Sequence, residues 1–242
     1  MAARKIAIFV EGQAELITVR EFLLKKYNYS ISLNCYKLFS KNEMGEVPFQ
    51  WPNPEASLHY QIVQVGNDVG VLSAMLIRQE FMWKAGYEKL IGLRDMYSAE
   101  YKKRSDVINE NVNQLFVNAV GKAIEAKSSK PGQITMCFSI MEIESWYLAM
   151  HPVFEKMDER LTTGLIHDKL GYDLNKVNPE TEFFHPAKTL SEIFTLTGTG
   201  YNKRAGQIES LCGLLTTEDF ERLYNSANCN SFNIFHNAVC VN

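Results

Sequence analysis

A short apolar run near the start of the chain is the feature that most constrains the fold. Residues 6–10 read IAIFV, and Glu11 and Gly12 follow before apolar side chains recur at helical spacing over residues 13–27. A run of β-branched and aromatic residues this short predicts a fully buried strand, and the spacing after it predicts a helix. Open α/β sheets bind ligands at the carboxyl ends of their strands, so Glu11 is expected at a functional edge.

The alternation of strand and helix continues along the chain. Further strands are expected at residues 31–39, 60–66 and 89–98, helices at 69–84 and 107–126, and a strand that passes into a helix over 134–149. This order predicts an α/β fold with a mostly parallel central sheet flanked by helices. From residue 150 onward the periodicity is helical, so we expect an α/β domain over 1–150 and a mainly α-helical C-terminal region over 151–242 that completes the site.

Composition narrows the class of protein. Hydrophobic residues make up 46% and charged residues 22%, which is typical of a globular protein and excludes disorder as the main state. No apolar run approaches the roughly 20 residues of a membrane span, and no cleavage site precedes the first strand, so we expect a cytoplasmic protein without a membrane partner. The net charge of −3 means that any nucleic acid must meet a local basic patch.

The five cysteines are scattered, with no Cys-x-x-Cys pair, so a disulfide framework is not expected. Cys229, His236 and Cys240 offer three zinc ligands, but a fourth is missing and the spacing departs from that of zinc fingers. Buried thiols are the simpler reading of these cysteines.

Acidic residues stand at the ends of three expected strands. Glu11 follows the first, Asp95 ends the strand at 89–98, and Glu142 and Glu144 follow the strand that starts at residue 134. Parallel strands end at one edge of a sheet, so these acids are expected to converge, and a divalent cation that prefers oxygen ligands would neutralise them. The competing reading is that acids at strand ends cap helices and that Glu15 and Glu21 face solvent on the first helix.

Residues 8–23, IFVEGQAELITVREFL, and 91–98, IGLRDMYS, resemble the Toprim fold, the catalytic domain shared by topoisomerases, primases and the nuclease domain of OLD (overcoming lysogenisation defect) proteins. Glu11-Gly12 matches the glutamate and glycine that end the first Toprim strand. A later Toprim strand ends in Asp-x-Asp, and the corresponding residues here are Asp95-Met96-Tyr97. This pattern resembles an OLD-like bacterial branch of the family, which has Asp-x-Tyr at this point.

Two further motifs of that branch are matched, by 142–149, EIESWYLA, and by Pro186-Ala187-Lys188 followed by 200–203, GYNK. One departure is Ala14, where threonine is usual. The four motifs stand in the family's order and cover most of the chain.

The resemblance implies roles for these residues. It implies Glu11, Asp95 and Glu144 as catalytic metal ligands, with Glu142 and Glu15 close to the metal, which would be Mg²⁺ or Mn²⁺. Lys188 and Lys203 are the candidates for neutralising charge on the leaving oxygen, and Arg204 for binding backbone phosphate. Tyr97 donates a hydrogen bond but lacks the charge of the aspartate that it replaces.

The function implied is a metal-dependent nuclease that hydrolyses DNA or RNA, acting as effector of a bacterial anti-phage defence system beside an ABC-type ATPase. The sequence contains no P-loop, so ATP would be bound by another subunit. A homo-oligomer is also open. The alternatives are a non-catalytic Toprim-like subunit that binds the ATPase or nucleic acid, and an acyl or glycosyl hydrolase, for which no Gly-x-Ser-x-Gly elbow is present. Candidate nucleic-acid contacts are Lys25-Lys26, 102–104 with Tyr101, and 201–204.

Overall fold

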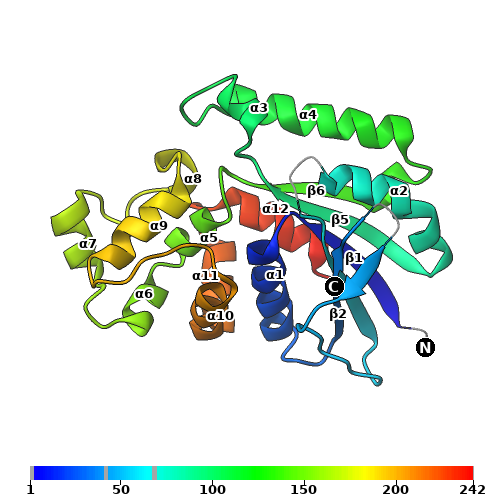
Figure 1. Cartoon of the computed structure of the whole chain (residues 1–242), viewed down its shortest axis with the longest axis horizontal. Helices are drawn as coiled ribbons and strands as arrows, with labels where there is room; N and C mark the ends of the chain where they lie inside the picture. Colours follow the sequence, from blue (N-terminus) through cyan, green and yellow to red (C-terminus); the bar gives the residue numbers. More distant parts are fainter. Residues whose placement is uncertain (1–2, 41–42, 67–69, 242) are drawn as a thin grey trace. The chain divides into compact units, whose positions relative to one another are not determined.

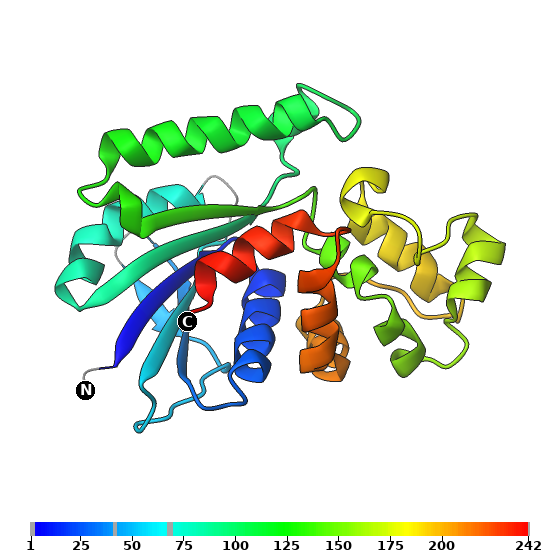
Figure 2. The ribbon, with the colours of Figure 1, turned by 180° about the vertical axis from the view of Figure 1, so that it is seen from behind.

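The computed structural model describes residues 3–40, 43–66 and 70–241, which form two compact units (Figures 1 and 2). The first comprises the described residues up to Arg94 together with Glu110–Phe138 and the residues from Asn237 onward. The second comprises Asp95–Asn109 and Ser139–His236. The units interleave along the sequence, so neither coincides with the segment 1–150 or 151–242 taken alone.

A six-stranded sheet in the order β3-β2-β4-β1-β5-β6 forms the centre of the first unit. β1 pairs in parallel with β4 and β5, β4 also pairs in parallel with β2, and the edge strand β3 is antiparallel to β2. The expected α/β class with a mostly parallel sheet is thus confirmed. The strands are β1 (Arg4–Val10), β2 (Ser32–Leu38), β3 (Met44–Glu46), β4 (Leu58–Gln64), β5 (Tyr87–Asp95) and β6 (Ile134–Ser139).

Helices cover both faces of this sheet. α1 (Gln13–Lys26) lies on one face, and α2 (Gly70–Lys84) and α4 (Glu110–Lys127) lie on the other (Figures 1 and 2). Side chains alternate between the two faces of a strand, so the run at residues 6–10 supplies apolar groups to both helical layers. All five side chains of this run are at most 1% exposed, which explains why the run is continuously apolar.

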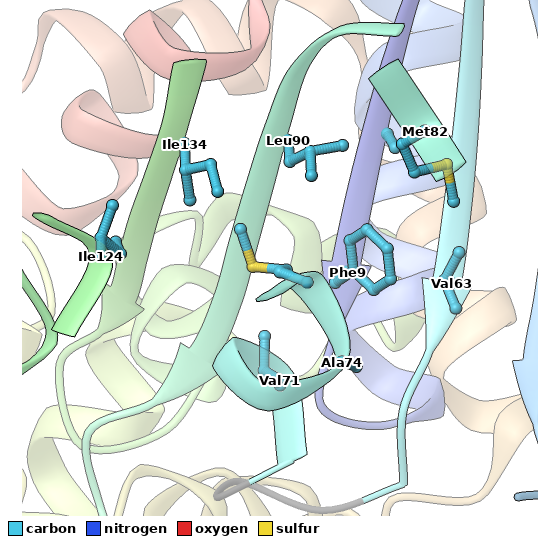
Figure 3. Close-up of a cluster of buried hydrophobic side chains, with 10 residues drawn as sticks. Phe9, Val63, Val71, Ala74, Met82, Leu90, Ile124 and Ile134 are labelled. Atoms are coloured by element: carbon cyan, nitrogen blue, oxygen red, sulfur yellow. The ribbon is translucent and has the colours of Figure 1, made fainter. Parts of the chain in front are cut away.

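A hydrophobic cluster joins α2 to the sheet. Phe9, Val63 and Leu90 from three strands pack against Val71 and other residues of α2 (Figure 3). Gly92 of β5 is part of this contact, since a Cβ atom there would meet the sulfur atoms of Met136 and Met75. The cluster therefore fixes the central strands, whose carboxyl ends lead to the acidic residues.

The second unit is helical, apart from the last residues of β5 and β6. Its helices are α3 (Ala99–Lys102), α5 (Glu144–Ala149), α6 (Pro152–Met157), α7 (Thr163–Leu170), α8 (Pro179–Glu182), α9 (Pro186–Thr195), α10 (Ala205–Leu214), α11 (Thr217–Asn225) and most of α12 (Asn230–Val239). The expected helical C-terminal region is confirmed. Among the described residues, no helix is both long enough and apolar enough to cross a bilayer.

Candidate functional site

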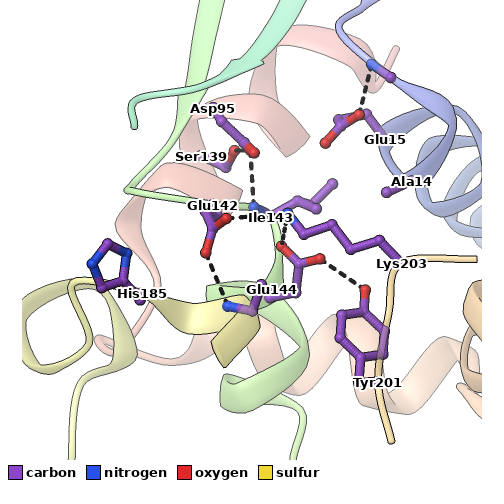
Figure 4. Close-up of polar contacts among 12 residues, drawn as sticks. Ala14, Glu15, Asp95, Ser139, Glu142, Ile143, Glu144, His185, Tyr201 and Lys203 are labelled. Atoms are coloured by element: carbon purple, nitrogen blue, oxygen red, sulfur yellow. Dashed lines mark hydrogen bonds and ion pairs between the residues drawn. The ribbon is translucent and has the colours of Figure 1, made fainter. Parts of the chain in front are cut away.

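Asp95 is anchored where two strands end. The Ser139 hydroxyl donates to Asp95 Oδ1 at 2.6 Å, and the backbone N–H of Ile143 donates to the same oxygen at 2.9 Å (Figure 4). Asp95 and Ser139 are the last residues of β5 and β6, and the carboxylate is buried. The strand ends and the turn after β6 therefore fix this acid in one position.

Glu142 lies in the turn between β6 and α5. Met141 before it adopts a left-handed φ of 60°, and Tyr97 N–H donates to the Met141 carbonyl at 2.8 Å. The turn directs Glu142 Oε2 to the backbone N–H of Ala187 at 2.9 Å, in the first turn of α9. A carboxylate at a helix N-terminus is stabilised by the helix dipole, so Glu142 also caps α9.

Glu144 opens α5 and is fully buried. The Tyr201 hydroxyl donates to its Oε1 at 2.7 Å, and Lys203 Nζ lies 3.0 Å from its Oε2 as an ion pair (Figure 4). Oε2 forms no hydrogen bond with the residues that the structure describes. Each oxygen of this buried carboxylate thus has one neighbour, and both neighbours come from the segment before α10.

The Lys203 ammonium is shared by the acids. It lies 3.2 Å from Glu142 Oε1 as well as 3.0 Å from Glu144 Oε2. Burial lowers the pKa of Lys203, but the charges of Glu144, Asp95 and Glu142 outweigh it and raise that pKa well above its ordinary value. Burial raises the pKa of Glu144, and Lys203 opposes this effect. One cation thus balances a cluster of three carboxylates, which we call the acid cluster: Asp95, Glu142 and Glu144.

An aromatic group flanks the acid cluster. Tyr97, two residues after Asp95, packs edge-on against His185 at 5.1 Å and Phe184 at 5.6 Å between ring centroids. Lys102 Nζ lies 5.0 Å from the centroid of the Tyr97 ring. Tyr97 thus places an aromatic ring and a neighbouring cation two residues after Asp95.

The first unit holds the other two candidate acids. Glu11 directly follows β1, where its N–H donates to Leu93 O at 3.2 Å and its carbonyl accepts from Gly66 N–H at 2.7 Å. Glu15 Oε2 accepts from Gly12 N–H at 2.7 Å, so Glu15 caps the start of α1, and because this residue is buried the reading that it faces solvent is wrong. Gly12 has an extended φ of −133°, so no left-handed conformation requires glycine there. Glycine suits this position for a steric reason, because a Cβ atom would lie 2.9 Å from that Glu15 oxygen.

The remaining basic candidates differ in exposure: Lys103, Lys188 and Arg204 are exposed, whereas Lys25 and Lys26 of α1 are only partly exposed. Lys188 pairs with Glu192 at 3.6 Å and Lys103 with Glu100 at 3.4 Å, each pair within one helical segment. Arg204 directly precedes α10 and is exposed. Such pairs contribute little to stability, which leaves these cations accessible to phosphate.

The residues that the structure describes include no group of three His, Cys, Asp or Glu side chains arranged to hold a metal ion. The C-terminal cysteines therefore do not form a zinc site among these residues. Cys229 instead donates to Glu180, and His236 stacks on Tyr224 with 4.0 Å between ring centroids. The acid cluster still fits a hard divalent cation by its chemistry, since it offers only oxygen ligands and includes a buried carboxylate oxygen without a hydrogen bond. The Lys203 ammonium lies against two of these carboxylates, those of Glu142 and Glu144.

Comparison with known proteins gives no match to a family model, to a curated protein or to a solved structure. The roles of these residues must therefore be argued from their chemistry.

Ser139 and Tyr201 complete the site. The sequence indicated no role for Ser139 and placed Tyr201 only in a family motif and in a candidate nucleic-acid contact, not beside a carboxylate. Ser139 was open to prediction as a partner of Asp95, since it ends a strand next to the one that ends in Asp95. Tyr201 gave a weaker signal, as it stands two residues before Lys203. Its hydroxyl meets a carboxylate 57 positions earlier in the chain, a contact that only the fold creates.

Proposed function

We propose that the protein is a metal-dependent nuclease that hydrolyses phosphodiester bonds of DNA or RNA with Mg²⁺ or Mn²⁺. The observation that carries this proposal is the acid cluster around a single cation position. Carboxylates that converge in a buried place repel one another, and a fold retains them where a cation is bound. Divalent cations with oxygen ligands serve phosphoryl transfer in this way.

Each residue of the site has a definable task. Asp95 and Glu142 are held in place by hydrogen bonds from neighbouring groups and would supply carboxylate oxygens to a metal ion. A bound divalent cation would polarise the phosphate and lower the pKa of a water molecule. Lys203, with a side chain 38% exposed, is the cation in the cluster that can reach a phosphate and neutralise charge on the leaving oxygen. Lys188 is an accessible second candidate for this task.

Glu11 and Glu15 belong to the first unit, and their assignment as ligands rests on the resemblance to Toprim proteins. Glu11 follows β1, which pairs in parallel with β5, the strand that ends in Asp95. Glu15 already serves as a helix cap, so Glu11 is the stronger candidate of the two. The role as an anti-phage effector and the ABC-type ATPase partner also rest on this resemblance.

A second candidate function is a non-catalytic Toprim-like subunit that binds the ATPase or nucleic acid. Two observations favour it. Tyr97 replaces an acid of the Toprim motif, and Lys203 already neutralises the cluster without a metal. In this reading the ion pairs stabilise the second unit and take no part in a reaction.

The test is a cleavage assay on the full chain with plasmid DNA and total RNA, with Mg²⁺, with Mn²⁺ and with EDTA. We expect metal-dependent cleavage of at least one substrate, and Glu144→Gln should reduce its rate by about 100-fold or more, since the metal loses a charged ligand. Glutamine is nearly isosteric and can still accept from Tyr201. The matched control is Glu209→Gln, an exposed residue of α10 in the same unit.

Cleavage that persists in EDTA or in Glu144→Gln would refute the proposed mechanism. If no substrate is cleaved, the assay is repeated with the proposed ATPase and ATP. Absence of cleavage there as well would favour the non-catalytic subunit.

A further inference from the structure

The segment between α9 and α10 closes the acid cluster with two side chains. Tyr201 and Lys203 each take one oxygen of Glu144, at 2.7 Å and 3.0 Å (Figure 4). Because Glu144 is fully buried, it has no other accessible face. A metal ion can therefore bind Glu144 only by replacing one of these two neighbours.

Lys203 is the neighbour that can leave. Its side chain is 38% exposed, whereas Tyr201 is 6% exposed and packs against Phe194 with 5.9 Å between ring centroids. Lysine carries its charge on a flexible stem that can swing without moving the backbone. Tyrosine is rigid and would have to leave the core of the unit.

The backbone holds Lys203 in place at a cost. Lys203 adopts a φ of 55°, a left-handed conformation that is unfavourable for a residue with a side chain. Gln207 secures the segment on both sides, since its side chain accepts from Asn202 N–H at 2.9 Å and donates to the Gly200 carbonyl. A strained residue held by its surroundings and aimed into a carboxylate cluster is typical of a functional position.

Given the proposed function, on which this inference rests, we propose that Lys203 is the resident cation of a closed acid cluster and that Mg²⁺ or Mn²⁺ opens the site by displacing it. A divalent ion brings two charges and takes several oxygen ligands at once, whereas the ammonium brings one charge. Once displaced, the ammonium is available to a substrate phosphate. The same side chain thus offsets part of the negative charge of the empty site and serves the substrate when the metal is bound.

Lys203 Nζ lies 3.2 Å from Glu142 Oε1 and 3.0 Å from Glu144 Oε2, so the ammonium stands between these two carboxylates. Its departure is what would allow them to share an ion.

The direct test measures the amine of Lys203 itself. The wild-type protein is treated with an amine-acylating reagent with and without saturating Mn²⁺, and modification of each lysine is followed by mass spectrometry. We expect Lys203 to react about fivefold faster or more with Mn²⁺, because the released amine no longer lies between the carboxylates of Glu142 and Glu144 and becomes accessible to the reagent. Lys176, which pairs with Asp173 at 3.0 Å outside the acid cluster, is the control and should not change.

A second measurement compares Mn²⁺ affinity by electron paramagnetic resonance. Lys203→Met should bind Mn²⁺ about tenfold more tightly or more, since the competing charge is gone, whereas Lys203→Arg, which keeps the charge, should bind no more tightly than wild type. Circular dichroism checks that both variants are folded.

The outcomes separate the two proposals. If wild type binds Mn²⁺ and the Lys203 amine reacts no faster, the displacement is refuted while the metal site stands. If neither wild type nor Lys203→Met binds Mn²⁺, the proposed metal-dependent function is refuted with it.

Discussion

Two glutamates that are two residues apart have different chemistry in this fold. Glu142 is 15% exposed and accepts from a helix N-terminus, whereas Glu144 is fully buried. Burial raises the pKa of Glu144 and the nearby Glu142 charge adds to this, while Lys203 and Tyr201 act against it. Glu144 is therefore the acid whose charge depends most on a neighbouring cation. For this reason the Gln substitution proposed above is made at Glu144.

Gly92 gives a prediction about the core of the first unit. In Gly92→Ala the new methyl group would overlap the sulfur atoms of Met136 and Met75 and lie 3.2 Å from Val71 Cγ1. Methionine side chains adapt, so we expect a loss of about 1 to 3 kcal/mol in the free energy of unfolding rather than loss of the fold.

Urea denaturation measures this effect. Gly121→Ala in α4 is the matched control, because nothing lies within 4 Å of its added Cβ and alanine is the better helix former. The control should be as stable as wild type or more stable by up to about 1 kcal/mol. A Gly92→Ala protein as stable as wild type would mean that the contact with the two sulfur atoms is looser than the structure has it.

At the residue scale, the sequence indicated which acids to examine but not how they are held. Asp95, Glu142, Glu144 and Lys203 were chosen from the sequence, and the structure places them in one cluster. Their use as metal ligands stays a prediction. Tyr201 was beyond reach because its role depends on a contact between residues far apart in sequence.

Capping at α11 gives a prediction at the scale of the element. Thr216 Oγ1 accepts from Asp219 N–H at 3.3 Å, and Asp219 Oδ2 accepts from Thr216 N–H at 2.9 Å and from Lys156 Nζ at 2.7 Å. Burial acts to raise the pKa of Asp219, but the hydrogen bonds from Lys156 and Thr216 outweigh it and the pKa is lowered. Asp219→Asn should therefore cost about 1 to 3 kcal/mol at neutral pH, the range for hydrogen bonds to a charged group.

The pH dependence of this effect has a definite sign. Because the pKa is lower in the folded protein, the stabilisation is complete above the pKa of the unfolded aspartate, about 3.9, and is lost as the pH falls through the folded value. Denaturation at several pH values should show the gap between wild type and Asp219→Asn closing below pH 4, with the exposed Glu221→Gln of α11 as control. A gap that is constant with pH would indicate that the charge of Asp219 does not contribute.

Elements with a strong apolar pattern were predictable from the sequence, and short ones were not. β1 and α1 lie within three residues of their expected bounds, because a continuously buried strand and a helix with a regular apolar face each leave a clear pattern. The edge strand β3 (Met44–Glu46) was missed, since three residues carry no periodicity and depend on pairing with β2. The expected helix at 107–126 begins only at Glu110, and a separate short helix, α3, precedes it.

The division into two units belongs to the scale of the whole molecule. The sequence suggested one boundary near residue 150, but the chain passes between the units after Arg94, Asn109, Phe138 and His236. A change in periodicity marks where helices begin to predominate, whereas a compact unit is set by contacts between distant segments. The sequence pattern alone could not show that residues 95–109 join the helical unit.

The cysteines make the cooperativity of the whole molecule measurable. Cys35 and Cys137 are buried in the first unit, and Cys212 and Cys229 are buried in the second. Burial raises the pKa of Cys35 and Cys137 to about 12 each and that of Cys229 well above its ordinary value. Thiols that stay protonated and covered do not react, so at pH 8 each should be modified only when its unit unfolds.

We expect all four thiols to become reactive in a single transition. The chain crosses between the units four times, and β5, β6 and α12 each run across a crossing without interruption, so unfolding one unit would break an element of the other. Pulses of iodoacetamide at increasing urea concentration, read residue by residue by mass spectrometry, provide the measurement, with Cys240 as the less buried internal reference. Modification of Cys212 and Cys229 at clearly lower urea than Cys35 and Cys137 would contradict this expectation and show that the helical unit unfolds by itself.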